Sequence, residues 1–226
     1  MRTIAILPVK TFDTAKQRLG DQLRAGARQA LAQAMFTDVL AALRRVRGLD
    51  AIAVVTRDRI AESTALSHRV RVLRDESQDG QSRASMVGIR QALADGFERA
   101  LLVPGDTPLL DPREIEGLLA AAAERGLGAV IVPDRHEAGT NALLLAPPGA
   151  VEPSFGPGSL ERHLAAAREA GIPHDVAEPA SLLLDVDTTD DLAELSSLLE
   201  TRRGRAPMTR GALAQLGRSR VGAPVA

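Results

Sequence analysis

The chain opens with TIAILPVKTFDTAKQRL, residues 3–19, an apolar run that leads into a polar loop. The run Thr3–Val9 is short and is broken by Pro8, which is typical of a buried parallel strand that ends in a loop. The loop holds Lys10 and Lys16, the only lysines among 28 Lys and Arg residues. An ammonium is a compact charge on a flexible stem and suits a triphosphate in a tight loop. We therefore expect both lysines to bind phosphate, with chance placement on a solvated loop as the alternative.

Short apolar runs alternate with helical patterns over the first part of the chain. Residues 23–46 carry apolar side chains at three- and four-residue spacing, which predicts a long amphipathic helix that ends before Gly48. The same criteria predict strands at 51–56, 70–73, 100–103 and 129–132, and helices at 58–67, 83–96 and from the N-cap Asp111 onward. This alternation favours an α/β fold with a Rossmann-like, doubly wound and mostly parallel sheet. In such sheets ligands bind at the carboxyl ends of the strands.

The second half of the chain departs from this alternation. We expect a strand at 140–146 that adds to the sheet in antiparallel orientation, and a helix at 159–170 that ends at Gly171. A last strand follows at 182–185. Thr188 then has the position and chemistry of an N-cap for a closing helix.

The C-terminal stretch differs in composition from the rest. Residues 201–226 contain six arginines and no acidic residue, and the apolar periodicity is lost. We expect a single domain over residues 1–200 and a basic, mobile tail over 201–226, with at most one weak helix near 209–217.

The overall composition limits the classes of partner. The formal net charge is −1 and no long basic run precedes the tail, which argues against nucleic acid and favours a small anion bound locally. The chain has no cysteine, which excludes disulfides, thiolate catalysis and cysteine-bound zinc. No stretch has the pattern of an export signal or a membrane span, and we expect a soluble, cytoplasmic protein. Four Phe and no Trp or Tyr leave a nucleobase to be held by backbone and small polar groups.

Carboxylates follow two of the predicted strands. Asp106 comes soon after the strand at 100–103, and Asp185 and Asp187 flank Val186 at the end of the last strand. Alternation along a strand would direct Asp185 and Asp187 to the same side. Oxygen ligands of this kind suit Mg²⁺, which takes one or two carboxylates together with substrate phosphates and water. The alternatives are a turn-forming role for Asp106 and helix capping for Asp187.

A second group of residues has the chemistry of an anion site. Thr140 follows Gly139, and the sequence Phe155-Gly-Pro-Gly-Ser159 opens a predicted helix. Free backbone amides at a helix start, the freedom of Gly156 and the Ser159 hydroxyl can together bind an anion. A glycine-rich turn with an ordinary serine cap would give the same sequence. His163 lies on this helix and either faces the anion or points to solvent.

Five short motifs occur in a fixed order along residues 3–199. They are Pro8-Val9-Lys10 with Lys16-Gln17-Arg18-Leu19, Gly105-Asp106-Thr107-Pro108-Leu109-Leu110, Pro133-Asp134-Arg135 through Gly139-Thr140-Asn141-Ala142-Leu143, Phe155-Gly156-Pro157-Gly158-Ser159 and Leu184-Asp185-Val186-Asp187-Thr188. In this combination the chain resembles the guanylyltransferases of coenzyme F420 biosynthesis. These enzymes have the nucleotide-diphospho-sugar-transferase-like fold.

The resemblance implies a reaction and a set of residues. GTP would be joined to a small phosphorylated three-carbon acid, phosphoenolpyruvate or 2-phospho-L-lactate, with release of pyrophosphate and with Mg²⁺ as cofactor. The implied roles are Lys10, Lys16 and Arg18 at the triphosphate, Pro8, Gly80, Gln81 and Ser82 at the nucleotide, Asp106, Asp185 and Asp187 at the metal, and Thr140, Gly156 and Ser159 at the acceptor. Lys10, Lys16, Arg18 and Asp106 would carry catalysis.

One turn departs from the family pattern and leaves alternatives open. Gly80-Gln81-Ser82 stands where a Gly-Leu-Asn-like turn is expected, and it is closer to the Gly-Gln-Ser of molybdenum-cofactor nucleotidyltransferases. A nucleotidyltransferase for a sugar or pterin phosphate is therefore one alternative, and a non-catalytic GTP-binding regulator is another. The sequence does not separate phosphoenolpyruvate, 2-phospholactate and 3-phosphoglycerate as acceptors, and it predicts no oligomeric state.

Overall fold

A seven-stranded sheet forms the centre of the molecule. The computed structural model describes residues 1–20, 22–75, 80–202 and 204–221. Its strands are β1 (Thr3–Pro8), β2 (Ala51–Thr56), β3 (Arg71–Arg74), β4 (Arg99–Leu102), β5 (Ala129–Pro133), β6 (Thr140–Leu145) and β7 (His174–Val176). They lie in the order β3-β2-β1-β4-β6-β5-β7. Only β6 is antiparallel to its neighbours, β4 and β5, so the predicted mostly parallel sheet with an antiparallel addition is confirmed for the described residues.

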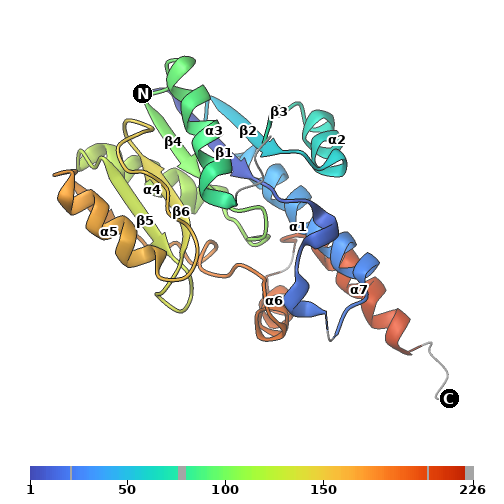
Figure 1. The fold of residues 1–226 in the computed structure, drawn as a ribbon. Coiled ribbons are helices and arrows are strands. Elements are labelled where there is room, and N and C mark those ends of the chain that lie inside the picture. Colours follow the sequence, from blue (N-terminus) through green and yellow to red (C-terminus); the bar gives the residue numbers. More distant parts are fainter. Residues whose placement is uncertain (21, 76–79, 203, 222–226) are drawn as a thin grey trace.

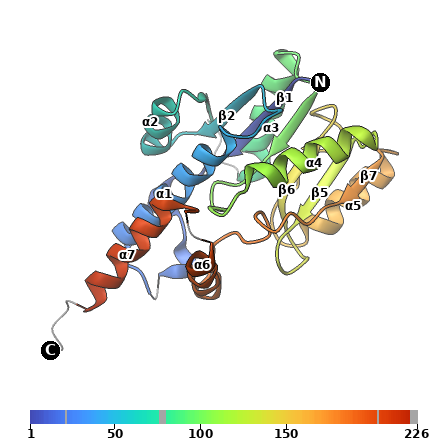
Figure 2. The same ribbon diagram turned by 180° about the vertical axis from the view of Figure 1, so that it is seen from behind.

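Helices cover both faces of the sheet (Figures 1 and 2). On one face lie α1 (Ala25–Leu43), α2 (Arg59–Ser67) and α4 (Pro112–Glu124), whose buried side chains pack with Leu7, Val54 and Leu101 of the sheet. On the other face α3 (Gln81–Ala94) and α5 (Ser159–Glu169) pack with Ile6 and Val55. Alternate residues of one strand thus face opposite layers, as a doubly wound sheet requires.

Helix α1 is buried on two sides. Phe36 and Leu40 pack on the sheet, whereas Leu31 and Met35 pack in a third cluster with α6 (Thr189–Thr201) and α7 (Pro207–Val221). The helix predicted at 23–46 is therefore present, but its apolar residues do not form the single stripe of a surface helix. A helix that is apolar on several sides is a core helix, and here it connects the sheet to the outer helices α6 and α7.

The C-terminal stretch corrects one expectation. In place of a mobile tail with a weak helix, Pro207–Val221 form α7, which packs along α1 (Figure 2); residues 203 and 222–226 of the expected tail lie outside the described residues. The buried Asp38 of α1 accepts hydrogen bonds from the backbone N–H groups of Met208 (3.2 Å) and Thr209 (2.8 Å) and from the Thr209 hydroxyl (2.7 Å). Asp38 thus satisfies N–H groups at the start of α7 as an N-cap residue would. Local sequence cannot reveal this contact because the capping carboxylate comes from a distant helix.

The strand expected at 182–185 is absent from the described structure, where the segment begins in a turn, closed by a bond from the Leu182 N–H to the Pro179 carbonyl, and does not pair with the sheet. The strand β7 instead pairs with β5. Leu182 and Leu184 are apolar because they enter two different hydrophobic clusters, not because they belong to a strand. β7 was missed because its sequence, His-Asp-Val, has no apolar run.

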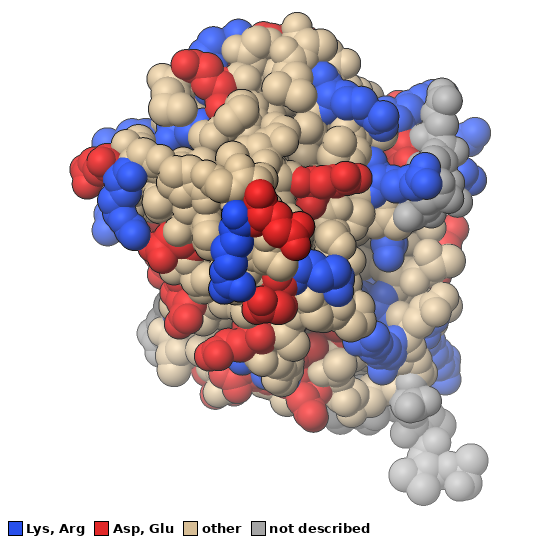
Figure 3. All heavy atoms as spheres, turned by 60° about the vertical axis from the view of Figure 1, so that its left-hand side comes forward, with Lys and Arg blue, Asp and Glu red and all other residues tan. Residues whose placement is uncertain are grey.

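Charged side chains are spread over the face that Figure 3 shows, with basic and acidic groups interspersed. No helix in the described part of the chain is both long and apolar enough to cross a membrane.

Candidate active site

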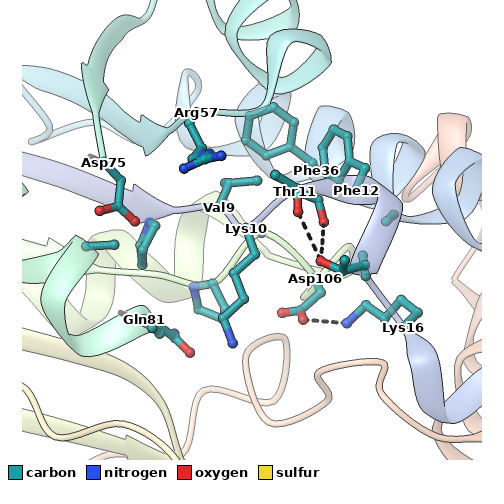
Figure 4. A pocket seen from close by; sticks show the side chains of 18 of the residues that line it. Val9, Lys10, Thr11, Phe12, Lys16, Phe36, Arg57, Asp75, Gln81 and Asp106 are labelled. Carbon is teal, nitrogen blue, oxygen red and sulfur yellow. Dashed lines mark hydrogen bonds and ion pairs between the residues drawn. The ribbon is translucent and has the colours of Figure 1, made fainter. Parts of the chain in front are cut away.

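A cavity of about 430 Å³ lies at the carboxyl ends of the central strands. Its wall is formed by the segment after β1, by Arg57 after β2, by Asp75 after β3 and by Pro104 to Asp106 after β4, and the start of α3 closes one side. Lys10 extends its side chain into the middle of this space (Figure 4). Because strand ends of a parallel sheet meet at one edge, the loops expected to bind a ligand do converge here.

The loop after β1 is held in place by two contacts. Phe12 is buried beneath α1, with its ring 5.9 Å from the ring of Phe36. The Phe12 N–H donates to the carboxylate of Asp58 (2.8 Å), which also N-caps α2 through the N–H groups of Ile60 and Ala61. The loop is therefore anchored at Phe12, between the two lysines, to α1 and to the start of α2.

Lys16 is the central side chain of the site. Its ammonium lies 2.5 Å from Oδ2 of Asp106 and 2.9 Å from Oδ1 of Asp187, and its side chain is only 6% exposed. Burial by itself would lower the pKa of Lys16, but the two carboxylates outweigh it and raise the pKa well above the ordinary value. The Lys16 backbone has φ of 56°, a left-handed conformation that costs energy in a non-glycine residue and is common at functional sites. Lys16 is thus a buried, permanently charged cation.

The segment that carries Asp185 is held by Asn141. The Asn141 side-chain amide donates to the carbonyls of Leu182 (2.8 Å) and Leu183 (3.0 Å) and lies 3.3 Å from Oδ1 of Asp185. Burial, with the negative charges of Asp106 and Asp187, raises the pKa of Asp185 to about 6. The three carboxylates predicted as metal ligands therefore face a common region, although no strand aligns them.

Asp187 is oriented by a capping box. Asp191 accepts hydrogen bonds from the backbone N–H groups of Asp187 (3.0 Å) and Thr188 (2.6 Å), while Thr188 caps α6 as its sequence predicts. The other oxygen of Asp191 pairs with Arg135, 2.7 Å away, in the turn between β5 and β6. The sequence revealed the cap, but the link to Arg135 is visible only in the folded chain.

The carboxylate chemistry suits a hard divalent cation, although the side chains as placed do not form a complete metal site among the described residues. Asp106 Oδ1 is buried and has no hydrogen-bond partner in the described part of the chain, so it is available to a ligand. Carboxylate oxygens are the ligands that such cations prefer. In this arrangement the described residues contain no group of three His, Cys, Asp or Glu side chains close enough to hold a metal by themselves. The Lys16 ammonium lies between Asp106 and Asp187 instead.

The residues predicted for the nucleotide separate into two sets. Pro8, Lys10, Gly80 and Gln81 line the cavity with Lys16. The predicted base or ribose turn begins at Gly80, whose φ of 97° only glycine adopts freely, and its backbone leads into α3. Ser82 is turned toward the acceptor side, where its hydroxyl accepts a hydrogen bond from the Phe155 N–H (2.8 Å).

Arg18 does not join this set. It lies exposed on the short helix η2 (Gln17–Leu19) and is not among the residues that line the cavity. The motif alone placed it beside Lys16, but the turn of the chain after Lys16 carries the two side chains to different surroundings.

The residues predicted for the acceptor lie around the start of α5. Thr140 begins β6, and its hydroxyl is 2.9 Å from Nδ1 of the buried His163. Ser159 begins α5, and its buried hydroxyl has no partner among the described residues. Gly156 has φ of 111°, which permits the sharp turn before the helix. These residues do not line the 430 Å³ cavity, but the Ser82–Phe155 bond connects the two regions.

The sheet topology and the cation–carboxylate site at its strand ends define a nucleotidyltransferase. The fold matches a solved structure assigned as a nucleotide-diphospho-sugar transferase from Desulfovibrio desulfuricans G20, with a TM-score of 0.75 at 16% identity, over 96% of this chain and 98% of that one. Residues 3–206 match the family described as guanylyl transferase CofC like, and the chain belongs to this family. The resemblance drawn from the motifs is thereby confirmed.

The curated relatives are guanylyltransferases named for three different acceptors. The chain is 49% identical to a phosphoenolpyruvate guanylyltransferase of Conexibacter woesei, over 97% of this chain and 98% of the relative. It is 35% identical to a 3-phospho-D-glycerate guanylyltransferase of Colwellia psychrerythraea, over 89% and 94%. It is 33% identical to a 2-phospho-L-lactate guanylyltransferase of Methanothermobacter thermautotrophicus, over 86% and 84%.

Proposed function

We propose that this protein transfers the guanylyl group of GTP to phosphoenolpyruvate and releases pyrophosphate, as a step in coenzyme F420 biosynthesis. The observation that carries the proposal is the placement of Lys16 between Asp106 and Asp187 at the edge of a cavity that Lys10 also enters. Two cations and a set of carboxylates at strand ends suit a nucleoside triphosphate with its metal.

The chemistry needs alignment more than acid–base groups. A phosphate oxygen of the acceptor attacks the α-phosphorus of GTP, and the bond between this phosphorus and the oxygen that bridges to the β-phosphate breaks. Pyrophosphate leaves with that oxygen. The attacking oxygen is already ionised at neutral pH, so no general base is required, and no covalent enzyme intermediate forms. The protein's task is to bring two anions together and to stabilise charge at the transferring phosphorus.

The lysines and carboxylates divide this task. Lys10 and Lys16 bind the triphosphate oxygens and offset the charge repulsion between the two substrates. Asp106, Asp185 and Asp187 would hold Mg²⁺, which when bound would supply positive charge at the phosphate oxygens. Asp191 and Asn141 are positioning residues, because they hold the backbone on either side of these carboxylates.

The acceptor site lies at the start of α5. Thr140, Gly156 and Ser159 offer hydroxyl groups and a flexible turn to the phosphate and carboxylate of the acceptor. The assignment of phosphoenolpyruvate follows from the relative that is 49% identical over nearly the whole of both chains. The relatives named for 2-phospho-L-lactate and 3-phospho-D-glycerate are less similar, at 33% and 35% identity.

A panel of substrates tests this proposal. The purified protein is incubated with Mg²⁺, one of GTP, ATP, CTP or UTP, and one of the three phospho-acids, and pyrophosphate release is measured. We expect release with GTP and phosphoenolpyruvate at a rate well above every other pair. Preference for CTP, or for a sugar phosphate added in place of the acid, would instead favour a sugar nucleotidyltransferase.

A further inference from the structure

His163 is a buried titratable side chain that the reaction above does not use. It lies on α5 with no solvent exposure. Its Nδ1 is 2.9 Å from the Thr140 hydroxyl oxygen, its Nε2 is 2.8 Å from the backbone nitrogen of Ser154, and its ring packs edge-on against Phe155. The imidazole thus contacts both β6 and the loop that leads to Gly156.

These contacts determine which ring nitrogen carries the proton. A backbone N–H can only donate, so the Ser154 N–H requires Nε2 to be an unprotonated acceptor. Burial and the nearby positive charge of Arg162 lower the pKa of His163 to about 4, which keeps the ring neutral near pH 7. A neutral ring with an unprotonated Nε2 carries its hydrogen on Nδ1. Nδ1–H therefore donates to the Thr140 hydroxyl oxygen.

This direction has a consequence for the Thr140 hydroxyl. Its oxygen accepts from His163, so its own hydrogen is left to donate to another group. The structure shows no other hydrogen bond of this hydroxyl with a described residue. Thr140 begins β6, which runs antiparallel to its neighbours, so this residue lies at the edge of the sheet where the parallel strands end. Its side chain faces the layer of α5, whereas the next residue, Asn141, faces the opposite layer and holds the segment of Asp185. A donor there suits an anionic oxygen.

We propose that His163 is a positioning residue for acceptor binding: its Nδ1–H bond orients the Thr140 hydroxyl as a hydrogen-bond donor to the acceptor's phosphate or carboxylate. The inference rests on the proposed function for the identity of the acceptor. The same side chain holds the Ser154 backbone and supports Phe155, whose N–H reaches Ser82 beside the nucleotide cavity. His163 therefore couples acceptor binding to the shape of the loop.

Two substitutions separate the two bonds of the ring. In His163→Asn the amide nitrogen takes the place of Nδ1 and keeps the donor to Thr140. In His163→Gln the amide oxygen takes the place of Nε2 and keeps the acceptor for Ser154, but the donor to Thr140 is lost. We expect His163→Gln to raise the KM for phosphoenolpyruvate about 10-fold with little change in the KM for GTP, since a hydrogen bond to a charged group is lost. His163→Asn loses only the neutral hydrogen bond with the Ser154 backbone, so its KM values for phosphoenolpyruvate and for GTP should stay within about 3-fold of those of the wild type.

Thr140→Val supplies the matched comparison. It removes the hydroxyl and keeps the shape, so it should raise the acceptor KM at least as much as His163→Gln. Adding His163→Gln to Thr140→Val should raise that KM no further, because both changes remove one interaction. Equal effects of His163→Gln and His163→Asn, or a parallel rise of the GTP KM, would reduce His163 to a structural role.

A second measurement needs no turnover. A long-range ¹H–¹⁵N NMR spectrum at pH 7, assigned by comparison with His163→Asn, reports the tautomer of the ring. A proton on Nδ1 and a bare Nε2 are expected, and the opposite tautomer or a doubly protonated ring overturns the inference. If the spectrum shows the expected tautomer but GTP and phosphoenolpyruvate give no pyrophosphate, the proposed function fails while the direction of the Thr140 bond stands.

Discussion

Replacing Lys16 by methionine tests whether its ammonium is the resident cation of the carboxylate site. Methionine keeps the length of the side chain and removes the charge. In the folded protein the ammonium contacts Asp106 and Asp187 at 2.5 and 2.9 Å and is 6% exposed. The substitution therefore leaves two carboxylates, with Asp185 nearby, and no cation between them.

The size of the effect follows from burial. Removing one partner of a fully buried ion pair costs about 3–5 kcal/mol, whereas a surface pair contributes about 0–1 kcal/mol. The side chains of Asp106 and Asp187 are 27% and 48% exposed, so water screens much of the repulsion that remains. We expect Lys16→Met to lower the free energy of unfolding by about 2 kcal/mol in the absence of metal. Saturating Mg²⁺ should recover most of this loss, because a bound cation offsets the same charges.

The assay is urea unfolding of wild type and variant, each with EDTA and with Mg²⁺, alongside kcat/KM for GTP. Turnover of Lys16→Met should fall about 100-fold or more even in Mg²⁺, because a preorganised contact with the transferring group is lost. Lys10→Met is the matched control. Lys10 is exposed and forms no ion pair with a described residue, so its loss should reduce turnover but change stability by less than about 0.5 kcal/mol. Equal stability of wild type and Lys16→Met in EDTA would show that the ammonium does not offset the charges of the carboxylates, and a deficit that Mg²⁺ leaves unchanged would show that no cation replaces it there.

Three further predictions concern positions outside the reacting centre. The fold lowers the pKa of His163 to about 4 from an ordinary 6.5, so the unfolded chain binds more protons than the folded protein between these pH values. In urea titrations the free energy of unfolding of the wild type should therefore fall by up to about 3 kcal/mol as the pH drops from 6.5 to 4. That of His163→Asn should fall less. Asp38→Ala should cost about 2 kcal/mol, measured by thermal unfolding, since α7 loses its cap, while Asp38→Asn, which retains an acceptor, should cost less. Arg135→Gln removes the partner of Asp191 and so loosens the support of Asp187, which should raise the Mg²⁺ concentration for half-maximal rate about 10-fold. Arg125→Gln breaks an exposed ion pair with Asp175 and should leave this concentration unchanged. Equal shifts in the two variants would show that Arg135 does not support Asp187.

Features that are determined by residues close together in the sequence could be predicted. The strand–helix alternation located the sheet, Asp111 and Thr188 were recognisable as N-caps, and the strand at Thr140 was expected to be antiparallel. The same logic predicted that Lys16 and Asp106 lie close together, because residues that follow strands of a parallel sheet gather at one edge. These predictions needed only periodicity, capping chemistry and topology.

Features that depend on residues far apart in the chain could not be predicted from the sequence. The docking of α7 requires Asp38, a buried carboxylate on another helix. The leucines at 182–184 mimic a strand, although Asn141 and two separate hydrophobic clusters fix that segment. The role of His163 is set by the Ser154 backbone, which lies near it only because the loop folds back on α5. A sequence pattern carries no information on which donor meets which acceptor across such distances.

The most direct test of the central claim is ³¹P NMR of the protein with GTP, Mg²⁺ and phosphoenolpyruvate. We expect free pyrophosphate together with two new, mutually coupled phosphorus signals in equal amounts, because the α-phosphorus of GTP becomes joined through oxygen to the phosphorus of the acceptor. Asp187→Asn should give neither product at a comparable rate. GDP with inorganic phosphate, GMP without a coupled product, or GTP that binds and remains intact would contradict a guanylyl transfer.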